Sequence, residues 1–182
     1  MRFLVCSILL LVSLHSTAQV PALYSMHTNW DDRFTQWTIL TMDEEQEGSL
    51  TMLWEALNRI DEWEFSFDGV YGKIKLKTLG NKDQWELRIG NEVVTIRQLW
   101  PGDLSEWRIT DNSKTIEFEA PVPSDPFTWE LRQSSKYGDF VMYSENAGDP
   151  RDWVIVDKLS EDFPFALKMA MVFVPLIPLL PR

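Results

Sequence analysis

The feature that most constrains the fold is a tryptophan that returns about every 22 residues along the chain. Six of the nine tryptophans take part, at intervals of 26, 22, 22, 22 and 24 residues. These repeated tryptophans are Trp37, Trp63, Trp85, Trp107, Trp129 and Trp153. A fixed period of this length is typical of one supersecondary unit repeated along a chain. We therefore expect the six residues to play the same structural part in successive copies of one unit.

The residues around each repeated tryptophan alternate between apolar and polar, as in WEFSF (63–67) and WELRI (85–89). Alternation with a period of two predicts a strand with one buried face. A turn sequence such as Asp68-Gly69 follows, and then a second alternating run such as IKLK (74–77). Gly, Asn and Asp tolerate the backbone angles of tight hairpins, so the unit is predicted to be strand, turn, strand and loop.

Five full units and the strand of Trp153 predict an all-β fold, an antiparallel meander of about 11 strands. The acidic segment 43–47 lengthens the first turn and accounts for the interval of 26 residues. Because the tryptophans share one face, a slip of one residue would expose them all, so their row fixes the register. An apolar face of this size is expected to be buried. Either the sheet curls into a barrel around it, or it stays open and another segment covers it.

The opposite face of the predicted strands is charged, and residues of opposite sign recur on strands that should be neighbours. Its members are Glu64, Lys73, Lys75, Glu86, Arg88, Arg97, Arg108, Glu117, Glu119, Glu130 and Arg132. Two interpretations are open: a binding surface, or a solvated face whose cross-strand ion pairs each contribute little. The solvated face is the favoured interpretation.

The C-terminal residues 163–180 read FPFALKMAMVFVPLIPLL, an apolar segment after a polar fold. We expect a short helix over 165–173, ended by Pro175. Packing of this tail on the β-sheet is favoured over contact with a membrane or a protein partner, because Lys168 and three prolines make a poor anchor. Apolar residues on the normally polar side of the last hairpin indicate that it is covered on both faces. They are Val141, Tyr143, Val154 and Val156.

The N-terminus has the pattern of a secretory signal peptide. Arg2 precedes an apolar run over 3–14, and the small residues Ser16-Thr17-Ala18 follow it. We expect a signal peptide at 1–18 with cleavage near Ala18, an exported β-hairpin repeat domain at 19–162 and the apolar tail at 163–182; an uncleaved anchor is the alternative. The only cysteine of the sequence lies inside the signal segment, so the mature chain is expected to carry neither a disulfide nor a lipid on cysteine.

The sequence is strongly acidic, with a net charge of −11 from 17 basic and 28 acidic residues. Nucleic acids are bound through clusters of Lys and Arg, so a nucleic acid is not an expected partner. The 45% of hydrophobic residues and 13% of aromatic residues indicate a packed core rather than a disordered acidic tail.

The sequence carries no recognisable catalytic constellation, so no catalytic residue, metal ligand or cofactor is predicted. His27 is the one histidine after the signal segment, and one histidine without cysteines does not make a zinc site. Paired carboxylates, as glycosidases use, remain the one enzymatic option. The acidic residues before the repeated tryptophans recur with the unit, which favours turn capping over catalysis. They include Asp61, Glu62, Asp83, Glu106 and Asp152.

Two tryptophans outside the repeat, Trp30 and Trp100, are candidates for stacking on a sugar ring. The favoured interpretation is that they cap the ends of the hydrophobic rows. The acidic segments 43–45 and 149–152 lack the ligand spacing of a calcium loop, so calcium binding is not expected.

The W-x-[IL] strand, turn and I-x-[LF] strand resemble uncharacterised exported bacterial proteins with tandem β-hairpins, over roughly residues 33–159. The unit length is also similar to that of MORN repeats, whose hairpins stack into a single-layer sheet, although the Y-x-G-x-[WF] signature of that family is missing. Both resemblances concern architecture and imply no activity.

Three functions follow as hypotheses. The first is an exported, non-enzymatic structural or partner-binding module that acts through its sheet face or its tail. The second is a carrier of a small hydrophobic ligand inside a barrel. The third is a carbohydrate-binding or carbohydrate-active protein.

Overall fold

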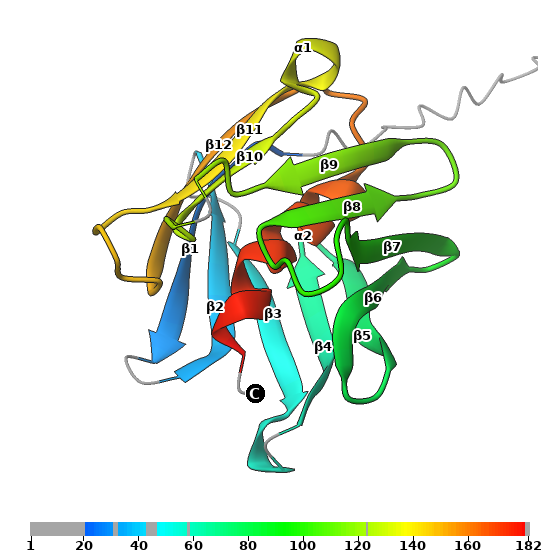
Figure 1. The fold of residues 1–182 in the computed structure, drawn as a ribbon, viewed down its shortest axis with the longest axis vertical. Helices are drawn as coiled ribbons and strands as arrows, with labels where there is room; N and C mark the ends of the chain where they lie inside the picture. The colour runs from blue at the N-terminus through cyan, green and yellow to red at the C-terminus, as the bar shows by residue number, and fades with distance from the viewer. Residues whose placement is uncertain (1–20, 31–32, 43–46, 58, 123, 181–182) are drawn as a thin grey trace, which may run out of the picture.

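The chain folds into a closed antiparallel β-barrel (Figure 1). The structure is a computed structural model that describes residues 21–30, 33–42, 47–57, 59–122 and 124–180. Within these residues, twelve strands follow one another around the barrel in chain order, and the last pairs with the first. The strands are β1 (Leu23–Trp30), β2 (Arg33–Thr41), β3 (Glu47–Trp54), β4 (Arg59–Phe67), β5 (Val70–Thr78), β6 (Asn81–Ile89), β7 (Glu92–Gln98), β8 (Glu106–Thr110), β9 (Thr115–Glu119), β10 (Thr128–Leu131), β11 (Gly138–Ser144) and β12 (Asp152–Leu159).

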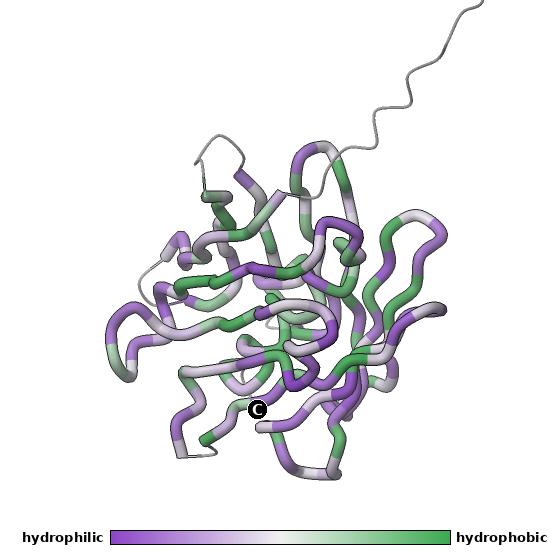
Figure 2. Tube along the Cα trace, turned by 90° about the horizontal axis from the view of Figure 1, so that it is seen from above, coloured by the Kyte–Doolittle hydropathy of each residue, from purple (hydrophilic) through white to green (hydrophobic). Residues whose placement is uncertain are grey.

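The predicted all-β meander is confirmed, and of the two arrangements left open the barrel is the one formed. The barrel has one strand more than the 11 expected, because β1 precedes the first repeated tryptophan. A β-bulge breaks the alternation of β1 between Leu23 and Ser25. As a result Leu23 and Met26, three residues apart, are both buried, and the period of two is lost there. Figure 2 shows the alternation of hydropathy along the other strands.

The six repeated tryptophans are buried inside the barrel, each at most 2% exposed. Each indole Nε1–H donates a hydrogen bond of 2.8 to 3.1 Å to the backbone carbonyl three residues earlier. The acceptors belong to Phe34, Ile60, Lys82, Leu104, Pro126 and Pro150. A buried indole needs such an acceptor. Each tryptophan therefore fills the core and also ties down the chain where it enters the strand.

The apolar tail forms the helix α2 (Phe165–Phe173), as expected, and continues as the 3₁₀ helix η2 (Val174–Leu179). Pro175 and Pro178 lack a backbone N–H, which is consistent with the change from α to 3₁₀ geometry. Residues 166–173 are all buried, so α2 is enclosed around its whole circumference. Figure 1 shows it running through the ring of strands. The tail thus packs on the inner face of the sheet.

Aromatic contacts join the helix to the barrel wall. The ring of Phe173 meets Trp63 and Trp85 edge-on, with centroids 5.6 and 5.0 Å apart. At the other end of α2, Phe165 packs against Phe65 and Phe67. These rings belong to one core cluster with the remaining tail residues, so the tail and the hairpin repeats share one hydrophobic core.

A buried ion pair joins the helix to the closing strands of the barrel. Lys168 Nζ lies 2.8 Å from Asp157 Oδ2, and the two side chains are 4% and 1% exposed. The same Asp157 oxygen accepts the N–H of Leu23 at 3.1 Å. Only three residue pairs are in register between β1 and β12, against seven between β11 and β12. The carboxylate therefore bridges β12, β1 and α2 where the barrel closes through a short strand pairing.

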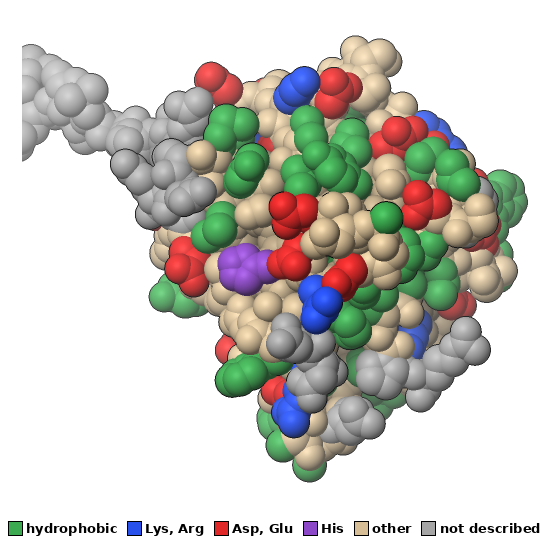
Figure 3. Space-filling view, turned by 90° about the vertical axis from the view of Figure 1, so that its left-hand side faces the viewer, with side chains coloured by type: hydrophobic (Ala, Val, Ile, Leu, Met, Phe, Trp, Pro, Cys, Tyr) green, Lys and Arg blue, Asp and Glu red, His purple; other side chains and the backbone are tan. Residues whose placement is uncertain are grey.

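The outer face of the last hairpin was expected to be covered, and at Tyr143 this is wrong. Tyr143 is 39% exposed, while Val141, Val154 and Val156 are half-buried. Hydrophobic side chains are visible on this side of the molecule in Figure 3. The short helices η1 (Glu55–Leu57) and α1 (Ser134–Tyr137) contain no buried residue.

Replacing one repeated indole should destabilise the barrel strongly. In Trp85→Phe the carbonyl of Lys82 loses its donor and the core loses part of a ring, which together should cost about 3 kcal/mol of unfolding free energy. The matched control is Trp100→Phe, at an exposed tryptophan, which should change it by less than about 0.5 kcal/mol. Urea unfolding followed by circular dichroism measures both. Equal losses in the two variants would contradict the assigned role of the repeat.

Removing the cation of the buried pair should be costly because it leaves a buried carboxylate alone. Lys168→Met should lower the free energy of unfolding by about 3 to 5 kcal/mol. The double variant Asp157→Asn/Lys168→Met keeps an oxygen for the Leu23 N–H and should recover part of the loss. Lys158→Met is the control, because Lys158 is an exposed lysine next to Asp157 on β12. Denaturant unfolding that ranks the double variant below Lys168→Met would contradict this account.

Candidate functional site

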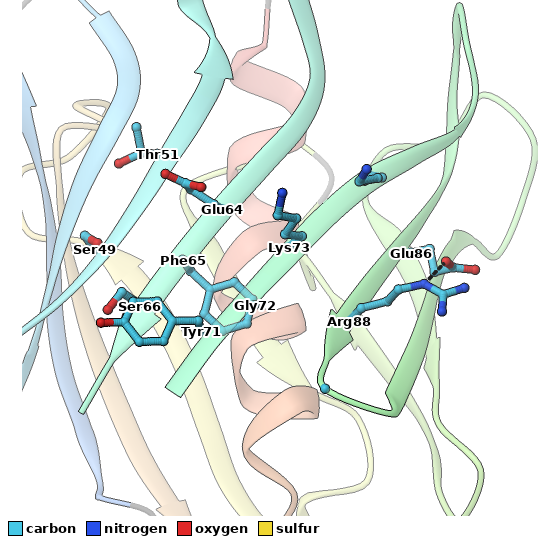
Figure 4. Close-up of a pocket in the computed structure, with 12 residues that line it drawn as sticks. Ser49, Thr51, Glu64, Phe65, Ser66, Tyr71, Gly72, Lys73, Glu86 and Arg88 are labelled. Carbon is cyan, nitrogen blue, oxygen red and sulfur yellow. Dashed lines mark hydrogen bonds and ion pairs between the residues drawn. The ribbon is translucent and has the colours of Figure 1, made fainter. Parts of the chain in front are cut away.

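The outward side chains of β3, β4, β5 and β6 line a concave groove of about 680 Å³ on the outside of the barrel (Figure 4). We call it the outer groove. Its outward lining residues are Ser49, Thr51, Glu64, Ser66, Tyr71, Lys73, Lys75, Glu86 and Arg88. None of these positions is a repeated tryptophan, because the repeated tryptophans point to the opposite face of the same strands.

The hollow follows from the strand register. Ser49, Ser66 and Tyr71 are successive partners across β3, β4 and β5. Thr51 and Glu64 form the start of the next row, which continues on β5 and β6. Short hydroxyl side chains on β3 and β4 therefore lie beside longer side chains on β5 and β6. The side chain of Tyr71 is 73% exposed and stands at the edge of this step.

The barrel wall under the groove is close-packed. Gly72 lies opposite Phe65 on the inner face, and a Cβ at Gly72 would lie 2.1 Å from the phenyl ring. The ring of Phe65 occupies the space that a side chain at residue 72 would need, so glycine is required there by the close approach. The backbone beneath Tyr71 and Lys73 is thereby held flat against the core.

Most charged side chains in and beside the groove form ion pairs. Glu62, at its edge, accepts hydrogen bonds from Lys75 Nζ at 3.0 Å and from the indole N–H of Trp54 at 3.2 Å. The bond from Lys75 is the main reason that the pKa of Glu62 lies below its ordinary value, so Glu62 is ionised at neutral pH. Arg88 donates to Glu86 at 2.6 Å.

With Glu64 and Lys73 included, three acidic and three basic side chains face one another in and beside the groove. The site is electrically balanced, and a purely anionic or cationic ligand gains no net attraction there. Hydroxyl groups, ion-paired side chains and one exposed aromatic ring can instead donate and accept hydrogen bonds and stack. This chemistry suits an uncharged ligand rich in hydroxyl groups.

Four of the other predicted surface charges, on β8, on β9 and directly after β10, form ion pairs. Arg108 donates to Glu117 at 2.8 Å. Arg132 reaches Glu117 at 2.9 Å and Glu106 at 3.3 Å, and it also contacts Glu119. On this side of the barrel the charged face carries cross-strand ion pairs, as the solvated-face interpretation predicts.

Other residues singled out in the sequence lie apart from the groove. Trp30, the last residue of β1, and Trp100, in the connection between β7 and β8, are both exposed. His27 is half-buried and opposite Asp152 in the register of β1 and β12; it is the purple side chain of Figure 3. The carboxylate of Asp61 binds Arg59 within its own strand, at 2.6 Å. The signal segment 1–18 and the acidic residues 43–46 lie outside the described residues.

Among the described residues no group of three His, Cys, Asp or Glu side chains could hold a metal ion. In the same part of the chain, no helix combines the length and apolar character needed to cross a bilayer.

The ion pairs around Glu117 should make stability depend on pH. The hydrogen bond from Arg108, helped by Arg132, lowers the pKa of Glu117. A lowered folded-state pKa contributes stability above the ordinary carboxyl pKa, and this contribution disappears as the pH falls through the folded-state value. Glu117→Gln should therefore be less stable than the parent at pH 7, with a difference that shrinks between about pH 5 and pH 3. Thermal unfolding over this range measures it, with Glu161→Gln in an exposed loop as the control; a constant difference would contradict it.

Comparison of the chain with protein-family models, with curated proteins and with solved structures finds no match.

Proposed function

We propose that the protein is an exported, non-enzymatic binding module that recognises its ligand on the outside of the barrel, in the outer groove. The observation that carries this proposal is the filled lumen. The helix α2 occupies the space in which a carrier barrel would hold its ligand, and the Lys168–Asp157 pair ties it to the wall. The outer groove offers a concave, polar surface without any rearrangement of the core.

The ligand class proposed for the groove is an uncharged saccharide. Three acids balance three bases around it, and the net charge of −11 repels anions from the molecule as a whole. Tyr71 supplies an exposed ring for stacking. Ser49 and Ser66 supply hydroxyl groups on neighbouring strands, which lie about 4.8 Å apart, and Thr51 adds a third hydroxyl two residues along β3.

The alternatives fit the geometry less well. A hydrophobic-ligand carrier would have to expel α2 and separate Phe173 from Trp63 and Trp85. A tail that binds a partner would have to leave the same core. A carboxylate-pair hydrolase would need acids available to the substrate, whereas Glu62 and Glu86 accept bonds from Lys75 and Arg88. The signal-peptide pattern of residues 1–18 supports export.

The proposal is tested by titrating the protein with a panel of neutral, acidic and basic oligosaccharides, followed by amide chemical shifts. We expect neutral sugars to shift resonances of β3 to β6 and charged analogues to bind more weakly. Tyr71→Ala should weaken binding of the neutral sugar at least about fivefold, the loss typical of one aromatic contact. Tyr143→Ala is the matched control, because Tyr143 is also an exposed tyrosine of an outer strand face. Unchanged affinity in Tyr71→Ala, or no binding of any neutral sugar, would contradict the proposal.

A further inference from the structure

Exposed apolar side chains gather at one end of the barrel. Because the strands run up and down in chain order, every second connection lies at the same end. The connections β1–β2, β3–β4, β5–β6, β7–β8, β9–β10 and β11–β12 therefore share one end, which includes the lower ends of β1 and β3 in Figure 1. Large hydrophobic side chains there are between 37% and 75% exposed. They are Trp30, Trp54, Leu57, Leu79, Trp100, Leu104 and Val122, and we call them the tryptophan rim.

The two ends of the barrel differ in their exposed apolar side chains. Of the eleven exposed large hydrophobic side chains among the described residues, seven belong to the tryptophan rim. Met42, Tyr24 and Tyr71 lie at or next to the opposite end, and Tyr143 lies on β11, one residue before that strand ends. At the opposite end, polar residues and glycine form hairpin turns, as at Asp68-Gly69. A random scatter of surface hydrophobic residues would need no explanation, whereas this concentration at one end does.

The tryptophans themselves divide in the same way. The six repeated ones are buried, and the remaining three of the nine all belong to the rim. Trp30, Trp54 and Trp100 are 54%, 41% and 60% exposed. The indole N–H of Trp30 donates to Gln36 at 3.1 Å and that of Trp54 to Glu62 at 3.2 Å. Two of the indoles thus direct their polar edge to protein groups. Tryptophan is the residue most characteristic of the boundary between water and lipid.

The arrangement fits a planar surface better than a protein partner. A protein interface usually has a continuous apolar centre. Here the seven side chains are spread over five connections and the strand ends beside them, and the ion pairs Arg33–Glu55 and Arg59–Asp61 lie at the same end of the barrel. Each of these exposed side chains can insert into a lipid surface independently of the others.

The charge of the rim selects the kind of lipid. Asp83, Asp103 and Glu106 add acidic groups near the connections, and the chain as a whole carries a charge of −11. Anionic lipids would be repelled. The end of the apolar tail lies at the same rim, because Lys82 Nζ donates to the carbonyl of Leu180 at 3.1 Å. We propose that the tryptophan rim docks this end of the barrel on the surface of a bilayer of zwitterionic lipids.

The test is flotation of the protein with vesicles of phosphatidylcholine alone, and with vesicles in which about a third of the lipid is phosphatidylserine. The full chain and the chain starting at Gln19 are both used, so that the apolar segment 3–14 is accounted for separately. We expect the chain from Gln19 to float with the phosphatidylcholine vesicles and less with the mixed ones. Each inserted ring should add about tenfold to the partition coefficient, so Trp30→Ser/Trp54→Ser/Trp100→Ser should remain unbound.

Two further variants keep the result interpretable. Leu57→Ser/Leu79→Ser alters the two most exposed rim residues and should weaken binding even if the triple variant fails to fold. Met42→Ser/Tyr24→Ser changes exposed residues away from the rim and should bind like the parent. Failure of the parent to float with phosphatidylcholine would overturn the proposal. Equal flotation of the parent and the Leu57/Leu79 variant would overturn it too. So would a dimer in sedimentation that the rim substitutions dissociate, because the rim would then bind a second copy of the chain.

Discussion

The structure depends on one hydrogen bond made six times, from a buried indole to the backbone carbonyl three residues before it. An indole N–H inside an apolar core is costly when it lacks an acceptor. The carbonyl at this distance belongs to the segment that leads into the strand, so the same bond that satisfies the ring also sets the path of the chain. The period of about 22 residues is the length that one hairpin and its return loop need before the next such bond.

The interior of a twelve-strand barrel has to be filled by more than the side chains of its wall. Eight strands enclose a space that wall side chains fill by themselves, and sixteen or more leave a channel. Twelve strands lie between these cases, and an α-helix about 10 Å across fits the remaining space. The tail meets the requirement because its helix is apolar on all sides, as buried helices are. The one charged residue of α2, Lys168, pairs with the inward-facing carboxylate of Asp157 on β12, and that carboxylate also accepts a hydrogen bond from a backbone N–H of β1.

Much of this fold can be predicted from local patterns, and its exceptions have physical causes. Alternation around Trp63 and Trp85 identifies strands because both residues occupy regular pleats. The helix over 165–173 is recognisable because prolines bound it. The strand β1 escapes detection because its bulge places Leu23 and Met26 on the same face. Closure between β1 and β12 is equally hidden, since it joins the two ends of the repeat region.

The candidate site is harder to predict than the fold. Tyr71, Ser66 and Ser49 are unremarkable in sequence, and they become a step in the surface only through the register of three strands. The tryptophan rim is identified partly from the sequence and partly from the topology. Trp30 and Trp100 stand out in the sequence because they break the repeat, yet only the up-and-down topology places them at the same end. Capping of hydrophobic rows, the interpretation favoured from sequence, does not account for their exposure.

The most direct test of the central claim is hydrogen exchange of the nine indole N–H groups, observed individually by NMR. Six of them, assigned to the repeated tryptophans, should exchange only through global unfolding. The indoles of Trp30, Trp54 and Trp100 should exchange orders of magnitude faster. Rapid exchange at any repeated tryptophan under native conditions would contradict the account of a barrel held by six buried indoles around its own C-terminal helix.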